Sequence, residues 1–301
     1  MAEVYIKSPL TYLQQLQQLK DRGLIIDNDE FVLSKLRTIS YYRLSTYWHS
    51  FRKIAKGGAI ADDFEEGSNF NEVMKLYEFD RRLRLLVMDA IERIEVYVRV
   101  LFAYHLGHRY GTFGYIKAAN FHPMFGHASW LETLEQEAAR SKDVFIAHYK
   151  NKYAGFPTLP IWMVTEVMSL GNLSFGYQGL KHDDKKIISN KFALHYKCLA
   201  DWLHTLTYIR NVCSHHGRLW NRELAIRPNR MRNMDWKPPI TPRNDRIFYV
   251  LLMLRYMLQK VQRIDDWIEQ CNSLLKPITA NRKWRSAMGI PANWMEHPVW
   301  Q

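Results

Sequence analysis

The longest periodic stretch of the chain covers residues 71–108 and reads NEVMKLYEFDRRLRLLVMDAIERIEVYVRVLFAYHLGH. Apolar side chains recur in it every three or four residues, at Leu76, Phe79, Leu83, Leu86, Ala90, Ile94, Val98 and Leu101. This spacing places them on one face of a helix, so the sequence predicts a central α-helix of about ten turns. The other face carries Glu92, Arg93, Glu95 and Arg99, which we interpret either as a solvated face or as support for a nearby active site.

Helical patterns continue on both sides of this central stretch. We expect helices over residues 8–22, 27–37, 41–53, 129–150, 161–170, 183–192, 198–216, 243–262 and 265–275. Residues 55–68 are rich in glycine and acidic residues and read as a loop, and no segment shows a convincing strand alternation. The sequence therefore predicts an all-α fold in a single domain of residues 1–301. Its parts are an N-terminal helical part (1–54), a helical core (70–275) and an extended C-terminal strap (276–301) with three tryptophans.

The predicted helix ends rest on capping residues. Ser8 before Pro9 reads as the cap of the first helix, and Ser129 with Glu132 reads as a capping box. Asp183 and Asp184 read as the cap of the helix that follows them. Gly171 and Gly217 read as residues that stop the helices before them.

Composition restricts the partners and the compartment. The formal net charge of +12 favours a polyanionic partner such as nucleic acid or an acidic membrane surface. We expect a cytoplasmic protein without a membrane-spanning segment, because no run of about 18 apolar residues and no signal-peptide pattern is visible. The three cysteines do not have the spacing of a disulfide framework, so we expect free thiols.

A second stretch, residues 208–221, reads YIRNVCSHHGRLWN and gathers unusual polar side chains at a predicted helix end. On a helical wheel Arg210 borders the apolar stripe of residues 199–213, whereas Asn211 and His215 point away from that stripe. A histidine can move a proton near neutral pH, and an arginine can stabilise negative charge. This pair suits metal-free cleavage of RNA, in which the 2′-hydroxyl attacks the neighbouring phosphate.

The candidate catalytic residues are Arg210, Asn211, His215 and His216. The basic segment that follows supplies candidate RNA-binding residues at Arg218, Arg222, Arg227, Arg230 and Arg232. The Arg-to-His spacing alone is weak, because it is expected roughly once by chance in this composition. A purely structural helix end and a solvated basic loop stay open as alternatives. The residues around Cys213 lack a second ligand pair with zinc spacing, so no metal site and no cofactor are expected.

The stretch Arg210-Asn211-x-x-x-His215, followed by His216-Gly217-Arg218, resembles the signature of the Abi family of bacterial abortive-infection proteins in the HEPN superfamily of helical ribonucleases. Further resemblance lies at residues 23–26, 41–44, 79–84, 91–95, 288–294 and 297–300. The resemblance implies a HEPN-like helical bundle with an active site at Arg210 and His215. It also implies metal-independent RNA cleavage at a composite site formed by a homodimer.

The leading hypothesis is a dimeric endoribonuclease that acts as an antiphage toxin. RNA would be its substrate, with a regulatory non-coding RNA as a further partner. The main alternative is a non-catalytic RNA-binding module that holds a regulatory RNA. A protein that acts at a membrane surface is a weaker third interpretation; we expect no membrane partner.

Overall fold

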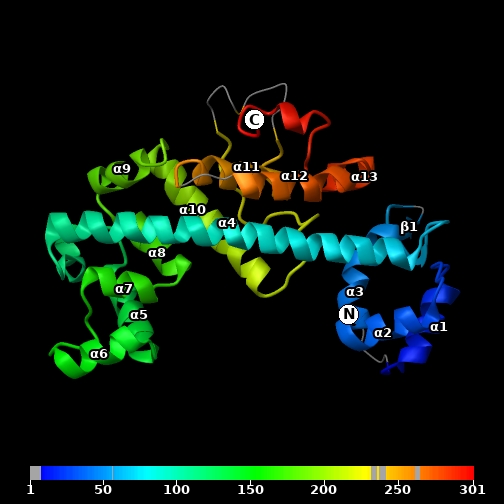
Figure 1. Ribbon diagram of the computed structural model, residues 1–301, viewed down its shortest axis with the longest axis horizontal. Helices are drawn as coiled ribbons and strands as arrows, with labels where there is room; N and C mark the ends of the chain where they lie inside the picture. The colour runs from blue at the N-terminus through cyan, green and yellow to red at the C-terminus, as the bar shows by residue number, and fades with distance from the viewer. Residues whose placement is uncertain (1–7, 56, 232–235, 237–241, 262–264) are drawn as a thin grey trace. The chain divides into compact units, whose positions relative to one another are not determined.

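The computed structural model describes residues 8–55, 57–231, 236, 242–261 and 265–301 (Figure 1). Almost all regular structure in them is helical, which confirms the all-α prediction. The chain forms two compact units, Met1–Arg82 and Leu83–Gln301.

The first unit begins with three short helices, α1 (Tyr12–Asp21), α2 (Asp29–Ile39) and α3 (Tyr41–Trp48), and a 3-10 turn, η1 (His49–Phe51). Their apolar faces bury Leu19, Leu36 and Trp48. Thr11 caps α1 in a capping box with Gln14, so the prediction that Ser8 is the cap is wrong. The hydroxyl of Thr11 accepts a hydrogen bond from a backbone N–H of the first turn, as a cap residue must.

A short hairpin stands where the sequence predicted a loop. Strands β1 (Arg52–Ile54) and β2 (Ile60–Phe64) pair in antiparallel fashion. The turn between them contains Gly57 and Gly58, which both have positive φ. The strands are short and mostly exposed, so their sequences carry little of the apolar alternation that identifies a strand.

Helix α4 (Phe70–Tyr110) is the predicted central helix, and it contributes residues to both units. Val73 and Leu76 are buried in its N-terminal part; Val87, Ile94 and Val98 are buried further along. Two 3-10 turns, η2 (Gly114–Ile116) and η3 (Ala118–Asn120), follow α4.

The next helices are α5 (His127–Arg140), α6 (Val144–Lys152), α7 (Ile161–Val167), α8 (Leu170–Gly179) and α9 (His182–Asn190). The single helix predicted over residues 129–150 is thus divided in two. Its expected cap is also wrong, because α5 begins after Gly126 and the Ser129 hydroxyl donates to the Gly126 carbonyl at 3.0 Å. Gly171 lies inside α8 and does not end a helix.

Asp184 does not act as the predicted cap of α9, which follows Lys181 without a side-chain cap. Its buried carboxylate instead contacts the end of α4. His105 Nε2 lies 2.6 Å from Oδ1, Arg109 Nη1 lies 3.0 Å from the same oxygen, and the Tyr110 hydroxyl donates to Oδ2 at 2.8 Å. Asp184 therefore fastens α9 to α4.

The second unit is completed by α10 (Tyr196–Ser214), α11 (Ile247–Leu258), α12 (Asp265–Thr279), α13 (Arg282–Ala287) and the turn η5 (Trp294–Glu296). The C-terminal strap is partly helical, contrary to the extended form that we predicted. Trp294 and Trp300 are buried, and Trp300 Nε1 donates to Asn272 Oδ1 at 3.0 Å. Among the described helices, none combines the length and the apolar character needed to cross a membrane.

Candidate active site

The end of α10 is built by two backbone hydrogen bonds. The His216 N–H donates to the Cys213 carbonyl at 3.0 Å, and the Gly217 N–H donates to the Val212 carbonyl at 2.8 Å. His216 lies in the left-handed region with φ of 56°, a place that the sequence had assigned to Gly217. The helix therefore ends at Ser214, and His215 and His216 follow it.

Gly217 lies in tight packing at this turn. A Cβ at Gly217 would lie 3.1 Å from the Val212 carbonyl oxygen and 3.2 Å from Val212 Cγ1. The carbonyl of Gly217 accepts a hydrogen bond from Arg84 Nη1 on α4 at 3.4 Å. The chain that leaves α10 is thus held close to both helices.

The side chains of the motif point in different directions, as the helical wheel predicted. Residues on one face of α10 are buried, at Leu199, Trp202, Leu203, Leu206, Ile209 and Cys213. Arg210 is half-buried beside this face, whereas Asn211, His215 and His216 are exposed. Arg210 Nη1 and Asn211 Oδ1 are 3.5 Å apart, at the long limit of a hydrogen bond.

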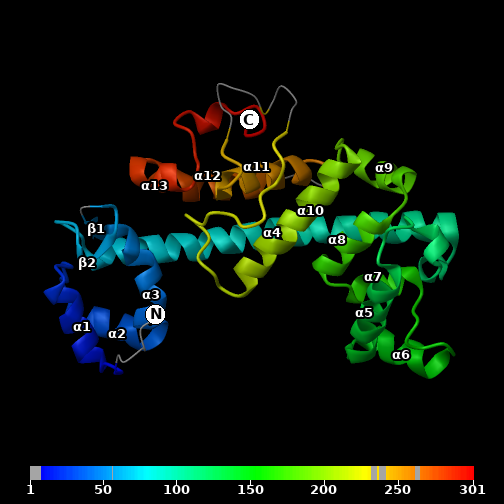
Figure 2. The same cartoon turned by 180° about the vertical axis from the view of Figure 1, so that it is seen from behind.

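Arg210 opens onto a pocket of about 390 Å³ between α10 and α4, two helices that cross in Figure 2. The pocket is lined by Leu85, Met88, Asp89, Ile91, Glu92 and Glu95 besides Arg210. Three carboxylates therefore surround the guanidinium on this side. The sequence had identified Glu92 and Glu95 as part of a charged helix face, with solvation and support of a nearby active site as the two interpretations.

Glu95 is the most enclosed of these carboxylates. Arg99 Nη2 donates to Glu95 Oε1 at 2.6 Å and to the Met168 carbonyl at 2.7 Å. Burial raises the pKa of Glu95, and the positive charges of Arg99 and Arg210 offset part of that increase. A charge on Glu95 is therefore less favourable than in water, although two arginines are near it.

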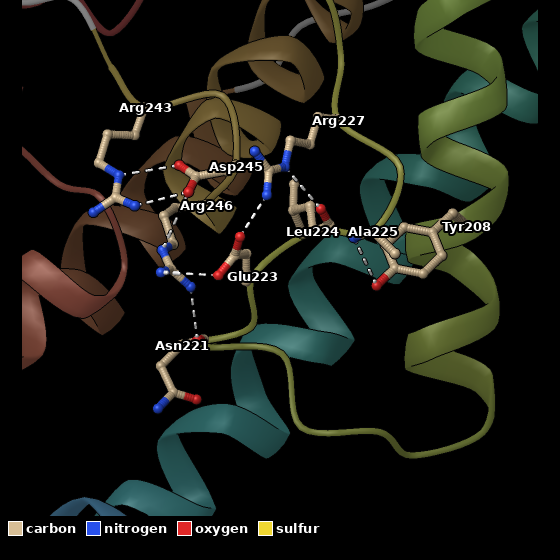
Figure 3. A network of polar contacts seen from close by, with 9 residues as sticks. All are labelled: Tyr208, Asn221, Glu223, Leu224, Ala225, Arg227, Arg243, Asp245 and Arg246. Atoms are coloured by element: carbon tan, nitrogen blue, oxygen red, sulfur yellow. Dashed lines mark hydrogen bonds and ion pairs between the residues drawn. The ribbon is translucent and has the colours of Figure 1, made fainter. Parts of the chain in front are cut away.

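The basic segment after α10 neutralises part of its own charge (Figure 3). Arg227 forms an ion pair with Glu223, and Arg246 Nη2 lies 3.8 Å from the other oxygen of Glu223. Arg243 donates to both oxygens of Asp245, at 3.0 and 2.7 Å. These contacts reduce the positive field that the sequence alone suggested.

The other predicted RNA-binding arginines lie in different settings. Arg222 is half-buried, and its Nε donates to the Arg218 carbonyl at 2.8 Å. Arg218 is also half-buried, and Arg230 is exposed. Arg232 lies outside the described residues.

The segment is anchored near Asn229. Asp201 on α10 accepts hydrogen bonds from the Asn229 backbone N–H and from its side-chain amide, both at 2.8 Å. The Tyr249 hydroxyl donates to the Asn229 carbonyl at 3.0 Å. The anchor holds the segment against α10 and α11 after it has passed the motif.

The three cysteines, all within the described residues, form no disulfide, and two of them are poor candidates for nucleophiles. Burial raises the pKa of Cys198 to about 12 and raises the pKa of Cys271 still further. Within the described ranges, no group of three or more histidine, cysteine or acidic side chains could hold a metal ion.

Comparison with known proteins gives one finding. A family model described as Abi-like protein matches residues 34–221, which is more than half of the chain. The matched region contains the motif from Arg210 to His216 and ends at Asn221, before most of the basic segment. Neither the curated proteins nor the solved structures give a match.

Proposed function

The chain belongs to the Abi-like protein family, and from this membership and the end of α10 we propose a metal-independent endoribonuclease with HEPN-like chemistry. The family points to abortive-infection defence, so the enzyme would act as an antiphage toxin. One observation carries the proposal. An arginine borders a pocket while an amide and two imidazoles stand exposed at the same helix end, within the matched region.

The proposed reaction is an internal transfer at the phosphate. His215 accepts the proton of the RNA 2′-hydroxyl, and the resulting oxygen forms a bond to the adjacent phosphorus. The bond from phosphorus to the 5′-oxygen breaks, and that oxygen takes up the proton that His215 had accepted, which regenerates the neutral imidazole. The products are a 2′,3′-cyclic phosphate and a 5′-hydroxyl. Arg210 stabilises the crowded phosphate, Asn211 positions Arg210, and His216 is a second candidate for proton transfer.

A composite site follows from the helix geometry. Five positions correspond to about 140° around a helix axis, and His215, five positions after Arg210, directly follows the last residue of α10. One phosphate therefore meets both groups most easily when a second copy supplies one of them. We accordingly propose a homodimer in which each copy contributes to the other's site.

The carboxylates beside Arg210 restrict the direction from which RNA approaches. Asp89, Glu92 and Glu95 line the pocket on one side of the guanidinium and repel a phosphate there. The phosphate would instead reach Arg210 from the side of Asn211 and His215. Beyond the motif, Arg218, Arg222, Arg227, Arg230 and Arg232 would bind backbone phosphates, with Arg227 giving up its pairing to Glu223.

The test is incubation of RNA with the wild type, Arg210→Ala and His215→Ala in EDTA. Each variant is expected to lose cleavage by about 100-fold or more, the usual contribution of such groups. Arg37→Ala and His204→Ala are matched controls, because these side chains are exposed and lie outside the motif.

If the wild type and all four variants bind RNA equally and none cleaves it, the nuclease proposal is rejected. That result would leave the alternative, a module that holds a regulatory RNA. Full activity in a monomer, measured by light scattering, would reject the composite site.

A further inference from the structure

A second pocket is lined by residues of α4 and α7, toward the C-terminal end of α4. Figure 1 shows where these two helices lie. It encloses about 490 Å³. Val100, Ala103 and Tyr104 line it from α4, and Trp162 lines it from α7. Two aromatic rings and a mainly apolar floor are typical of a pocket that receives a flat ligand. We call this site the α4–α7 groove.

The two aromatic rings are exposed, and the ring of Tyr104 is held in place by its neighbour. Tyr104 is 66% exposed and Trp162 is 54% exposed, so neither ring is needed to fill the core. The Tyr104 ring packs on His108 with 4.0 Å between ring centroids, and His108 Nδ1 lies 2.8 Å from the Tyr104 carbonyl oxygen. A ring held in this way offers a flat apolar surface at little entropic cost.

Gly107 lines the groove where α7 packs close to α4. A Cβ at this position would lie 3.3 Å from Ile161 Cγ2, so the absence of a side chain allows α7 to begin close against α4. The Ile161 N–H donates to the Thr112 carbonyl at 2.9 Å, which fixes the start of α7. The groove is thus part of the packed structure of the second unit.

The rim of the groove carries polar groups of both signs. Arg99 lines one end and is held by Glu95 and by the Met168 carbonyl. Glu166 is exposed on the opposite helix, and His108 lies beside Tyr104. An exposed carboxylate accepts hydrogen bonds and donates none at neutral pH.

An adjoining pocket of about 340 Å³ shares Trp162 and Glu166 with the groove. Its other lining residues include Phe145, His148 and Tyr153. Lys152 lies 5.3 Å from the Tyr153 ring centroid. Trp162 thus stands between two aromatic-lined hollows with a cation nearby, an arrangement that suits successive bases of a single strand.

The groove is also connected to the motif. Arg99 lines the groove, its ion-pair partner Glu95 lines the pocket of Arg210, and both residues lie along one face of α4. Glu95 and Tyr104 are nine residues apart, or about 14 Å along the helix axis. The groove therefore lies about two and a half turns of α4 beyond the pocket that Arg210 borders.

From this arrangement we propose that the α4–α7 groove binds an unpaired nucleobase of single-stranded RNA, stacked on Trp162 and Tyr104. The inference rests on the proposed function, since it names the subsite that selects the substrate of that reaction. Glu166 favours adenine, cytosine or guanine, whose amino groups donate to a carboxylate. Uracil is disfavoured, because its single donor is flanked by two carbonyl oxygens.

The test measures binding without cleavage. Short single-stranded 2′-O-methyl oligonucleotides of one base type cannot be cleaved by 2′-hydroxyl attack, and their affinity is followed by fluorescence anisotropy in EDTA. Trp162→Ala and Tyr104→Ala are expected to weaken binding by about tenfold each. Ala103→Phe, which fills the groove and keeps both rings, should have the same effect.

Matched controls separate stacking from a general surface effect. Trp162→Phe and Tyr104→Phe should recover most of the affinity, and Tyr42→Ala removes an exposed aromatic ring that lies outside the groove. The wild type should bind the uracil oligonucleotide more weakly than the other three oligonucleotides. Glu166→Gln should reduce this difference in affinity.

Three outcomes would overturn the proposal. The first is an affinity of the groove variants within twofold of the wild-type affinity, and the second is a wild type that binds no single-stranded probe. The third is that Trp162→Ala mainly reduces self-association, measured by sedimentation. The last outcome would identify the groove as a protein interface. The probes cannot be cleaved, so base binding in the groove is tested independently of nuclease activity. If the groove variants still cleave RNA with the base preference of the wild type, the nuclease proposal stands and the base subsite is rejected.

Discussion

Glu95 is the residue at which two parts of the candidate site meet. It lines the pocket of Arg210 and pairs with Arg99, which lines the α4–α7 groove. Burial raises its pKa, so its ionised form is less stable in the folded protein than in the unfolded chain. The ionised Glu95 holds Arg99 in place but lowers the free energy of unfolding, and the size of this effect depends on pH.

The sign of this dependence gives a prediction for Glu95→Gln. A carboxyl group with a raised pKa in the folded state stabilises the protein below its ordinary pKa, and the benefit is lost as pH rises through the raised value. The free energy of unfolding of the wild type should therefore fall relative to that of Glu95→Gln between about pH 4 and pH 7. Urea denaturation at both pH values measures the difference.

Glu92→Gln is the matched control, because Glu92 is an exposed carboxylate one turn earlier on the same helix. A wild type that gains stability relative to Glu95→Gln as pH rises would contradict the interpretation. That result would mean that the attraction of Arg99 and Arg210 outweighs the effect of burial.

At the scale of elements, the end of α10 combines a structural turn with the candidate chemistry. His216 occupies the left-handed region, which costs about 1–2 kcal/mol for a residue with a side chain. Glycine would meet the same turn without that cost. A histidine at this position is therefore less stable than the best choice for the turn.

His216→Gly separates the two roles. We expect the free energy of unfolding to rise by up to about 1 kcal/mol, since the backbone strain is relieved while glycine loses more entropy on folding. If His216 takes part in proton transfer, RNA cleavage should fall at the same time. A less stable variant would contradict the explanation based on strain, and wild-type cleavage would leave His215 as the candidate for proton transfer.

Long periodic segments could be predicted from the sequence, and short or locally determined features could not. The apolar spacing of α4 identified the helix nearly to its ends, because about ten turns repeat the same signal. The hairpin of β1 and β2 was missed because it is short and mostly exposed. Gly171 was read as a helix end, yet it lies in α8, where a Cβ would be 3.6 Å from Thr207 Cγ2 of α10.

The candidate site shows the same division. The helical wheel placed Arg210 beside the core and His215 away from it, because Arg210 lies on α10 and His215 directly follows its last residue. The pocket of carboxylates depends on α4 residues more than 100 positions away, such as Glu95. Pairing of Arg227 with Glu223 and of Arg243 with Asp245 also escaped prediction, because side-chain pairing in an irregular segment leaves no periodic pattern.

At the scale of the whole molecule, the net charge of +12 predicts strongly salt-dependent RNA binding. The internal ion pairs decide which arginines contribute to it. We expect Arg230→Ala to reduce the slope of log affinity against log salt by about 0.7, the value for one phosphate contact to a single strand. Filter binding over a salt series with an uncleavable oligonucleotide measures this slope.

Arg243→Ala is the matched control, because two of the three guanidinium nitrogens of Arg243 donate to Asp245. It should change the slope less than Arg230→Ala does. An equal change for the two variants would show that the ion pairs of the segment open when RNA binds.

Helix α4 has a consequence for how such a protein can be divided or recombined. The boundary between the two compact units falls after Arg82, inside an uninterrupted helix of 41 residues. Val73 and Leu76 are buried on one side of that boundary, and Val87 and Ile94 are buried on the other. Exchange of one unit between relatives must therefore join two half-helices in register, because an inserted or deleted residue turns every later side chain by about 100°.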